Sequence, residues 1–113
     1  MPPPPRLRGL QDSHRLHLLH GEVLFMPHEA VDTVYLIEHG SVVVFSPTGT
    51  GLIATLGPHC IIGLRDMLTG GVWQGIGLAH WPTVLRVFET AYIRELIDAA
   101  PKAHQQLLRE LAA

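Results

Sequence analysis

The sequence predicts a mainly β domain of the sandwich, barrel or jelly-roll class with flanking short helices. Three observations support this class. Short β-branched or apolar runs recur at regular spacing, at residues 33–37, 41–45, 52–56, 72–79 and 83–88. Turn-forming glycines and prolines separate these runs, and the apolar spacing becomes helical only after residue 88. Evenly spaced short strands are typical of all-β sandwiches, barrels and jelly rolls.

Length and composition restrict the function classes. The chain has 113 residues, which suits one domain, and it is 47% hydrophobic but only 16% charged. Such a low charge content predicts exposed apolar surface of the kind found at interfaces. A net charge of −2 without a basic run argues against DNA binding by this chain alone. The absence of a long apolar run predicts no membrane span, and the single cysteine, Cys60, fits a cytoplasmic protein without an internal disulfide.

The expected elements begin after a tail. Residues 1–13 should form a flexible proline-rich tail and a weak helix interrupted by Gly9, and residues 14–113 the folded domain. HRLHLL and GEVLFMP, at 14–19 and 21–27, predict the first two strands. The next three strands should be separated by turns at His39-Gly40, Pro47-Thr48-Gly49 and Gly57-Pro58.

The second half of the chain alternates between helix and strand signals. Residues 63–71 break the strand rhythm with one helical turn, LRDML, and two strands follow with Pro82 between them. Thr90 is the expected N-cap of a helix whose apolar face comprises Tyr92, Ile93, Leu96 and Ile97. After Pro101, a second helix carries the apolar stripe of Leu107, Leu108 and Leu111.

The most informative stretch is IIGLRDMLTGGVWQGIGLAH, residues 61–80, which is rich in glycine but has Arg65 as its only cation. A glycine-rich loop that leads into a helix can hold phosphate through its backbone amides. A phosphate site normally adds a cationic side chain as well. The stretch is therefore either an anion site, a disabled anion site, or a tight corner of a β protein.

The segments GEVLF, DTVYLIEHGSVVV, LGPHCIIG and YIRELIDAAPKAHQQLL, in this order, resemble the cyclic-nucleotide-binding domain family. This family supplies the sensor modules of catabolite-activator and Fnr-type regulators, and the resemblance covers about residues 15–113. It implies an antiparallel β-roll, or double-stranded β-helix, of about eight strands with flanking helices. It also implies a non-enzymatic regulatory or sensor role.

The resemblance identifies a ligand-binding loop. In the family, a glycine precedes a glutamate that binds the ribose, and an arginine followed by a small hydroxyl residue binds the cyclic phosphate. Here Gly63 matches, but Leu64 stands at the glutamate position and Gln74, followed by Gly75 and Ile76, at the arginine position. The candidate ligand-binding residues are therefore Gly63, Leu64, Arg65, Gln74, Gly75 and Ile76.

Two functions remain open at this point. The loss of both charged contacts favours a module that does not bind cyclic AMP or cyclic GMP in the usual way and acts through protein contacts or another ligand. The alternative is a genuine sensor of a cyclic nucleotide or haem with atypical contacts. Arg65 could turn inward to replace the missing cation, although a solvated helix face for Arg65 and Asp66 is favoured.

The remaining reactive side chains predict neither a metal site, nor a cofactor, nor an enzyme. His14, His17 and His20 recur at every third residue, but strand alternation would place His17 on the other face. Cys60, beside His59, could offer haem a thiolate, but a buried neutral cysteine that packs as a small apolar side chain is the simpler interpretation. Nucleophile motifs and the paired histidines of cupins are missing from the sequence.

Two further expectations concern packing and assembly. Trp73 and Trp81 are interpreted as packing residues, although Trp73, beside Gln74, could line the pocket. The stripe on the last helix either folds back on the roll or pairs with a second chain, so we expect a homodimer or a partner domain at the C-terminal helix.

Overall fold

The computed structural model describes residues 14–112 and the side chains of residues 15–107. The tail and weak helix expected over residues 1–13 lie outside the described residues, as do the side chains of Leu108 and Leu111. Within the described part of the chain, every helix is too short or too polar to cross a membrane.

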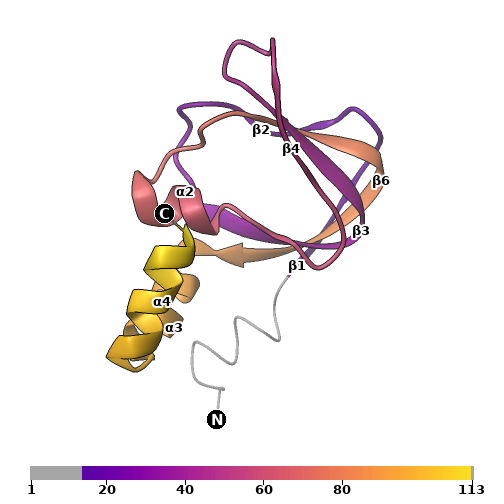
Figure 1. Ribbon diagram of the computed structural model, residues 1–113. Coiled ribbons are helices and arrows are strands. Elements are labelled where there is room, and N and C mark those ends of the chain that lie inside the picture. Colours follow the sequence, from indigo (N-terminus) through magenta and orange to yellow (C-terminus); the bar gives the residue numbers. More distant parts are fainter. Residues whose placement is uncertain (1–13, 113) are drawn as a thin grey trace.

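The strands form one antiparallel sheet that curls into a roll, and the helices project from one end of it (Figure 1). The sheet order is β1-β6-β3-β4, with β2 paired to β6 and β5 paired to β3. The strands are β1 (His14–Leu18), β2 (Val23–Phe25), β3 (Thr33–Phe45), β4 (Leu52–Leu56), β5 (Ile61–Ile62) and β6 (Ile76–Glu89). The predicted mainly β antiparallel roll is confirmed.

The predicted strand division was wrong at two places. His39-Gly40 was expected to be a turn, but β3 continues through it, and β6 likewise continues through Pro82. Each long strand therefore replaces two short ones, and β5 is a short strand that was not predicted. Among the described residues the sheet has six strands, whereas the resemblance implies eight. The strand predicted over 72–79 begins only at Ile76.

The two predicted interruptions face each other across the β3–β6 ladder, whose register shifts on both sides of His39. Gly40 has a φ of 83°, and a Cβ on it would lie 2.6 Å from the Pro82 carbonyl oxygen. The buried Thr83 hydroxyl donates to the Ser41 carbonyl oxygen at 3.0 Å. Because side-chain hydrogen bonds satisfy the backbone here, both strands bend without ending.

The core of the roll is closed by side chains from β3 and β6. Ile37, Val42 and Leu85 are fully buried, and Val34 is nearly so. A first short helix, α2 (Leu64–Thr69), follows β5 as predicted, and the helices α3 (Thr90–Ala99) and α4 (Lys102–Ala112) follow β6.

The start of α3 differs from the prediction. Glu89, in an extended conformation, occupies the N-cap position, and Thr90 is the first helical residue. The Thr90 hydroxyl donates to the Asp32 carbonyl oxygen at 3.2 Å. This side chain therefore links α3 to the residue before β3 instead of capping the helix. On the predicted apolar face, Tyr92 and Ile97 are buried while Leu96 stays 37% exposed.

Replacement of Gly40 by alanine should destabilise the roll by about 3 kcal/mol, because it combines a left-handed backbone with overlap against Pro82 and Thr83. Gly57→Ala is the matched control, since a Cβ there would meet no atom within 4 Å. Urea denaturation of both variants measures the difference. Equal midpoints for the two variants would contradict this account of the bend.

Candidate functional site

The candidate ligand loop runs from Gly63 through α2 and the segment 70–75 into β6. Hydrogen bonds hold the end of this loop against residues 28–31. The Val31 amide donates to the Gly71 carbonyl at 2.8 Å, and the Trp73 amide donates to the Glu29 carbonyl at 2.9 Å. The His28 amide donates to the Trp73 carbonyl at 2.9 Å. The backbone of Trp73 is thus fixed on both sides, which sets the direction of its side chain.

The indole of Trp73 lies over Gly63, the first residue of the loop. A Cβ added to Gly63 would come within 2.7 Å of Trp73 Cη2, and Gly63 has a φ of 102°. Trp73 is only 4% exposed. Its ring stacks on that of Phe25 with a centroid distance of 3.9 Å and an interplanar angle of 11°. The Tyr35 ring lies further away, at 6.2 Å.

Close packing accounts for two further glycines of the stretch. A Cβ on Gly77 would overlap the ring of Phe25, and one on Gly75 would overlap the Phe45 carbonyl oxygen. Three glycines that resemble a phosphate cradle in sequence therefore make room for two aromatic rings and one backbone approach. Of the alternatives for this stretch, the tight corner describes these three positions.

The two charged side chains of α2 differ in exposure. Arg65 is exposed, as predicted for a solvated helix face, but Asp66 on the same helix is partly buried. Burial raises the pKa of the Asp66 carboxyl, and the opposing influences are the Arg65 charge and a hydrogen bond from the Gln74 backbone amide. The Asp66 carboxyl thus lies close to the backbone of Gln74. The exposed Gln74 side chain donates to the Val72 carbonyl at 3.3 Å.

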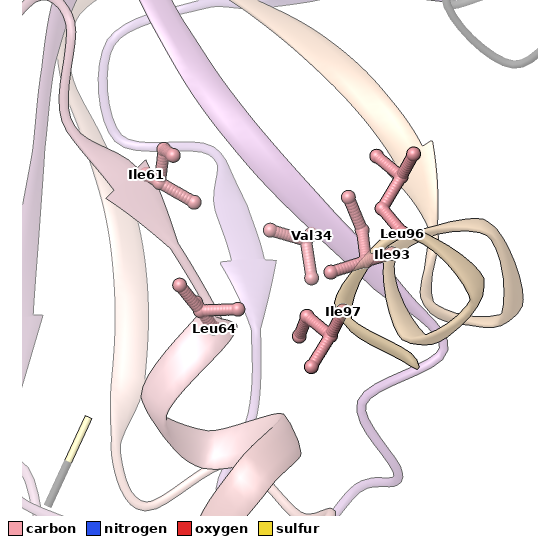
Figure 2. A pocket seen from close by; sticks show the side chains of 6 residues that line it. All are labelled: Val34, Ile61, Leu64, Ile93, Leu96 and Ile97. Carbon is pink, nitrogen blue, oxygen red and sulfur yellow. The ribbon is translucent and has the colours of Figure 1, made fainter. Parts of the chain in front are cut away.

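Leu64 faces the helical end of the molecule. It helps to line an apolar cavity of about 220 Å³ between the roll and α3 (Figure 2). The other lining residues are Val34, Ile61, Ile93, Leu96 and Ile97. Nearby, the Arg94 guanidinium donates to the Met67 carbonyl at 3.2 Å, which links α3 to α2. Leu64, at the family's glutamate position, therefore lines the apolar space between the loop and α3.

Apart from His28, whose backbone amide bonds to Trp73, the histidines and the cysteine described next lie outside the loop residues 63–75. His20 Nδ1 accepts a hydrogen bond from the Trp81 amide at 2.8 Å, beside the ring of His80. His59 and Cys60 form the corner between β4 and β5, where the Ile37 amide donates to the Cys60 carbonyl at 3.0 Å. Among the described residues, no three His, Cys, Asp or Glu side chains converge as metal ligands would.

The predicted site residues are thus only partly brought together. Gly63 and Gln74 border the same loop, Leu64 turns toward α3, and Gly75 and Ile76 enter the sheet against Phe45. The partial burial of Asp66 was not predicted. Trp73 is the packing residue that the sequence predicted, whereas Trp81 is 64% exposed and the same prediction for it was wrong. The available signal for Trp73 was a tryptophan next to the position of the missing arginine, since an apolar ring there needs an enclosed place.

Solved structures share this fold. EAL enzyme Bd1971 in its cGMP-bound form matches with a TM-score of 0.79 and 21% identity, covering 88% of this chain and 27% of that chain. The sensor domain of the transcriptional regulator DNR from Pseudomonas aeruginosa matches with a TM-score of 0.77 and 24% identity, covering 95% and 75%. The cyclic nucleotide-binding-like protein from Brucella abortus matches with a TM-score of 0.67 and 23% identity, covering 82% and 83%.

The extent of the similarity differs between these comparisons. The chain spans 27% of the length of EAL enzyme Bd1971. No curated protein sequence is significantly similar to it. The family model of the cyclic nucleotide-binding domain matches residues 15–100, most of the chain. Together with the roll, the loop and its short helix, this match shows that the chain belongs to the cyclic nucleotide-binding domain family.

Proposed function

We propose that the chain is a non-enzymatic regulatory module of the cyclic nucleotide-binding fold that does not bind cyclic AMP or cyclic GMP in the usual way. It acts through protein contacts or through a different ligand. The observation that carries this proposal is the charge of the loop: a partly buried carboxylate, Asp66, lies beside the Gln74 amide, while Arg65 is exposed to solvent.

The expected loss of affinity follows from the missing contacts. A hydrogen bond to a charged group contributes roughly 1.5–3 kcal/mol, and about 1.4 kcal/mol corresponds to a factor of ten. Without the family's glutamate and arginine, a cyclic nucleotide therefore loses about two to four orders of magnitude in affinity. Repulsion between the phosphate and Asp66 weakens binding further.

Calorimetric titration with cyclic AMP and cyclic GMP tests this proposal. The expected result is no saturable heat at ligand concentrations up to about 1 mM, because the phosphate lacks a counter-ion. Submicromolar binding of either nucleotide would contradict it and favour a sensor with atypical contacts. A Soret band in the visible spectrum of the purified protein would instead favour a haem sensor.

A pH series tests the environment of Asp66. Because burial raises its pKa in the folded protein, the native state takes up a proton at a higher pH than the unfolded chain. Stability therefore rises as the pH falls through the folded pKa, and Asp66→Asn should have the higher melting temperature at pH 7.

The advantage of Asp66→Asn should shrink as the pH is lowered toward the unfolded pKa of Asp66, since both side chains are then neutral. Glu38, whose pKa is lowered by its hydrogen bond to Arg15 and nearby positive charge, has the opposite effect in the same acid range. Glu38 is present in both proteins, so its contribution cancels when their melting temperatures at each pH are subtracted. A difference that grows on acidification would contradict an inward, desolvated carboxylate.

Exposed apolar side chains support a role in protein contacts. Ile61 and Leu107 are 57% and 54% exposed on the elements at the helical end of the roll. Exposed apolar surface of this kind is characteristic of interaction sites. We therefore propose that the C-terminal helices mediate a homodimer or bind a partner domain.

Light scattering at micromolar concentration should give a dimer mass, and Leu107→Lys should shift the protein toward a monomer. Leu52→Lys is the matched control, because Leu52 is 60% exposed on β4, away from the C-terminal helices. A monomer mass for the unmodified chain, or equal effects of the two variants, would contradict a helical interface.

A further inference from the structure

We propose that the indole of Trp73 fills the ligand-binding interior of the roll. It thereby prevents an external ligand with a flat ring from entering. This inference rests on the proposed function, because it gives a steric reason beside the missing charges. It assigns the exclusion to one side chain, whose removal should make the interior accessible to a cyclic nucleotide.

The indole ring lies directly on the first residue of the loop. Trp73 contacts Gly63, the family's loop glycine, so closely that no side chain larger than hydrogen fits at that residue. The family's ribose-binding position, Leu64, directly follows this glycine, and its phosphate-binding position, Gln74, directly follows Trp73. A ring that joins Trp73 to Gly63 therefore takes space between the backbones of these two positions.

The two stacked rings form a continuous contact between the loop and the sheet. The indole lies on Gly63 and stacks on Phe25, and Phe25 in turn lies on Gly77 of β6. Two glycines and two rings thus form a closed column from the loop to the sheet. Nearly parallel rings at 3.9 Å resemble the way in which an aromatic side chain binds a planar base.

Backbone hydrogen bonds of Trp73 fix the position of the indole. The amide and the carbonyl of Trp73 both bond to the segment 28–29, at 2.9 Å each. The neighbouring residue Val72 forms an isolated bridge with Ala30. Movement of the indole out of the roll therefore requires these backbone bonds to break, which distinguishes Trp73 from a side chain on a free loop.

The experiment compares two variants with the same charges. Asp66→Asn/Gln74→Arg supplies a cation and removes the carboxylate but keeps the ring. Adding Trp73→Leu to these substitutions also removes the ring while keeping an apolar side chain. Calorimetric titration with cyclic AMP and cyclic GMP should give binding at least about tenfold tighter for the variant that lacks the ring.

Two outcomes overturn the inference. Equal affinity of the two variants shows that the ring is no obstacle, and no binding by a folded triple variant shows that its removal does not open the roll. Trp73→Phe in place of Trp73→Leu serves as a second variant if the first does not fold, with a smaller expected gain. The proposed function is judged separately, on the unmodified chain, so the two can fail independently.

A second readout uses the fluorescence of Trp73. Trp81 is 64% exposed, so Trp81→Phe leaves Trp73 as the only tryptophan without disturbing the core. Its emission should be that of a buried indole and should not change with about 1 mM cyclic AMP. Emission of a solvent-exposed indole, or a saturable change on addition of nucleotide, would contradict an internal occupant.

Discussion

The stacking of Trp73 on Phe25, between Gly63 and Gly77, is the contact on which the arrangement of the loop depends. Both glycines are required because the two rings lie directly on their backbones. The backbone bonds between Trp73 and the segment 28–29 keep the indole pointed inward. A loop that resembles an anion cradle in sequence is thus packed in this structure like part of an apolar core.

The charges and the helices are consistent with this packing. Asp66 is partly buried beside the Gln74 backbone, and Leu64 contributes to the apolar cavity against α3. The guanidinium of Arg94 adds a polar link between α3 and the end of α2. The loop is therefore coupled to the helical end of the molecule by contacts that need no bound nucleotide, which agrees with a role in protein contacts.

Sequence patterns predicted the fold class and several elements well, because alternation and turn residues are local signals. β4 and the helical turn after Gly63 lie where the sequence placed them. Gly40 and Pro82 were misinterpreted as turns because the hydroxyl of Thr83, which satisfies the bent backbone, comes from the partner strand. Such pairing across the ladder is not visible in either segment alone.

The sequence predicted which positions form the candidate site, but it did not predict the directions of their side chains. The resemblance located Gly63, Leu64 and Gln74 on one loop, but whether a side chain points inward depends on tertiary contacts. Asp66 is partly buried beside the Gln74 amide, and Trp73 turns inward where Gly63 leaves room. Neither direction follows from the spacing of residues along the chain.

The central claim is that the indole of Trp73 fills the roll over Gly63. Nuclear magnetic resonance measures this contact most directly, through the chemical shift of the Gly63 α protons and their cross-relaxation with the indole protons. The account predicts an upfield ring-current shift and strong cross peaks, both unchanged by added cyclic AMP. An unshifted glycine without these cross peaks, or their loss when nucleotide is added, would contradict it.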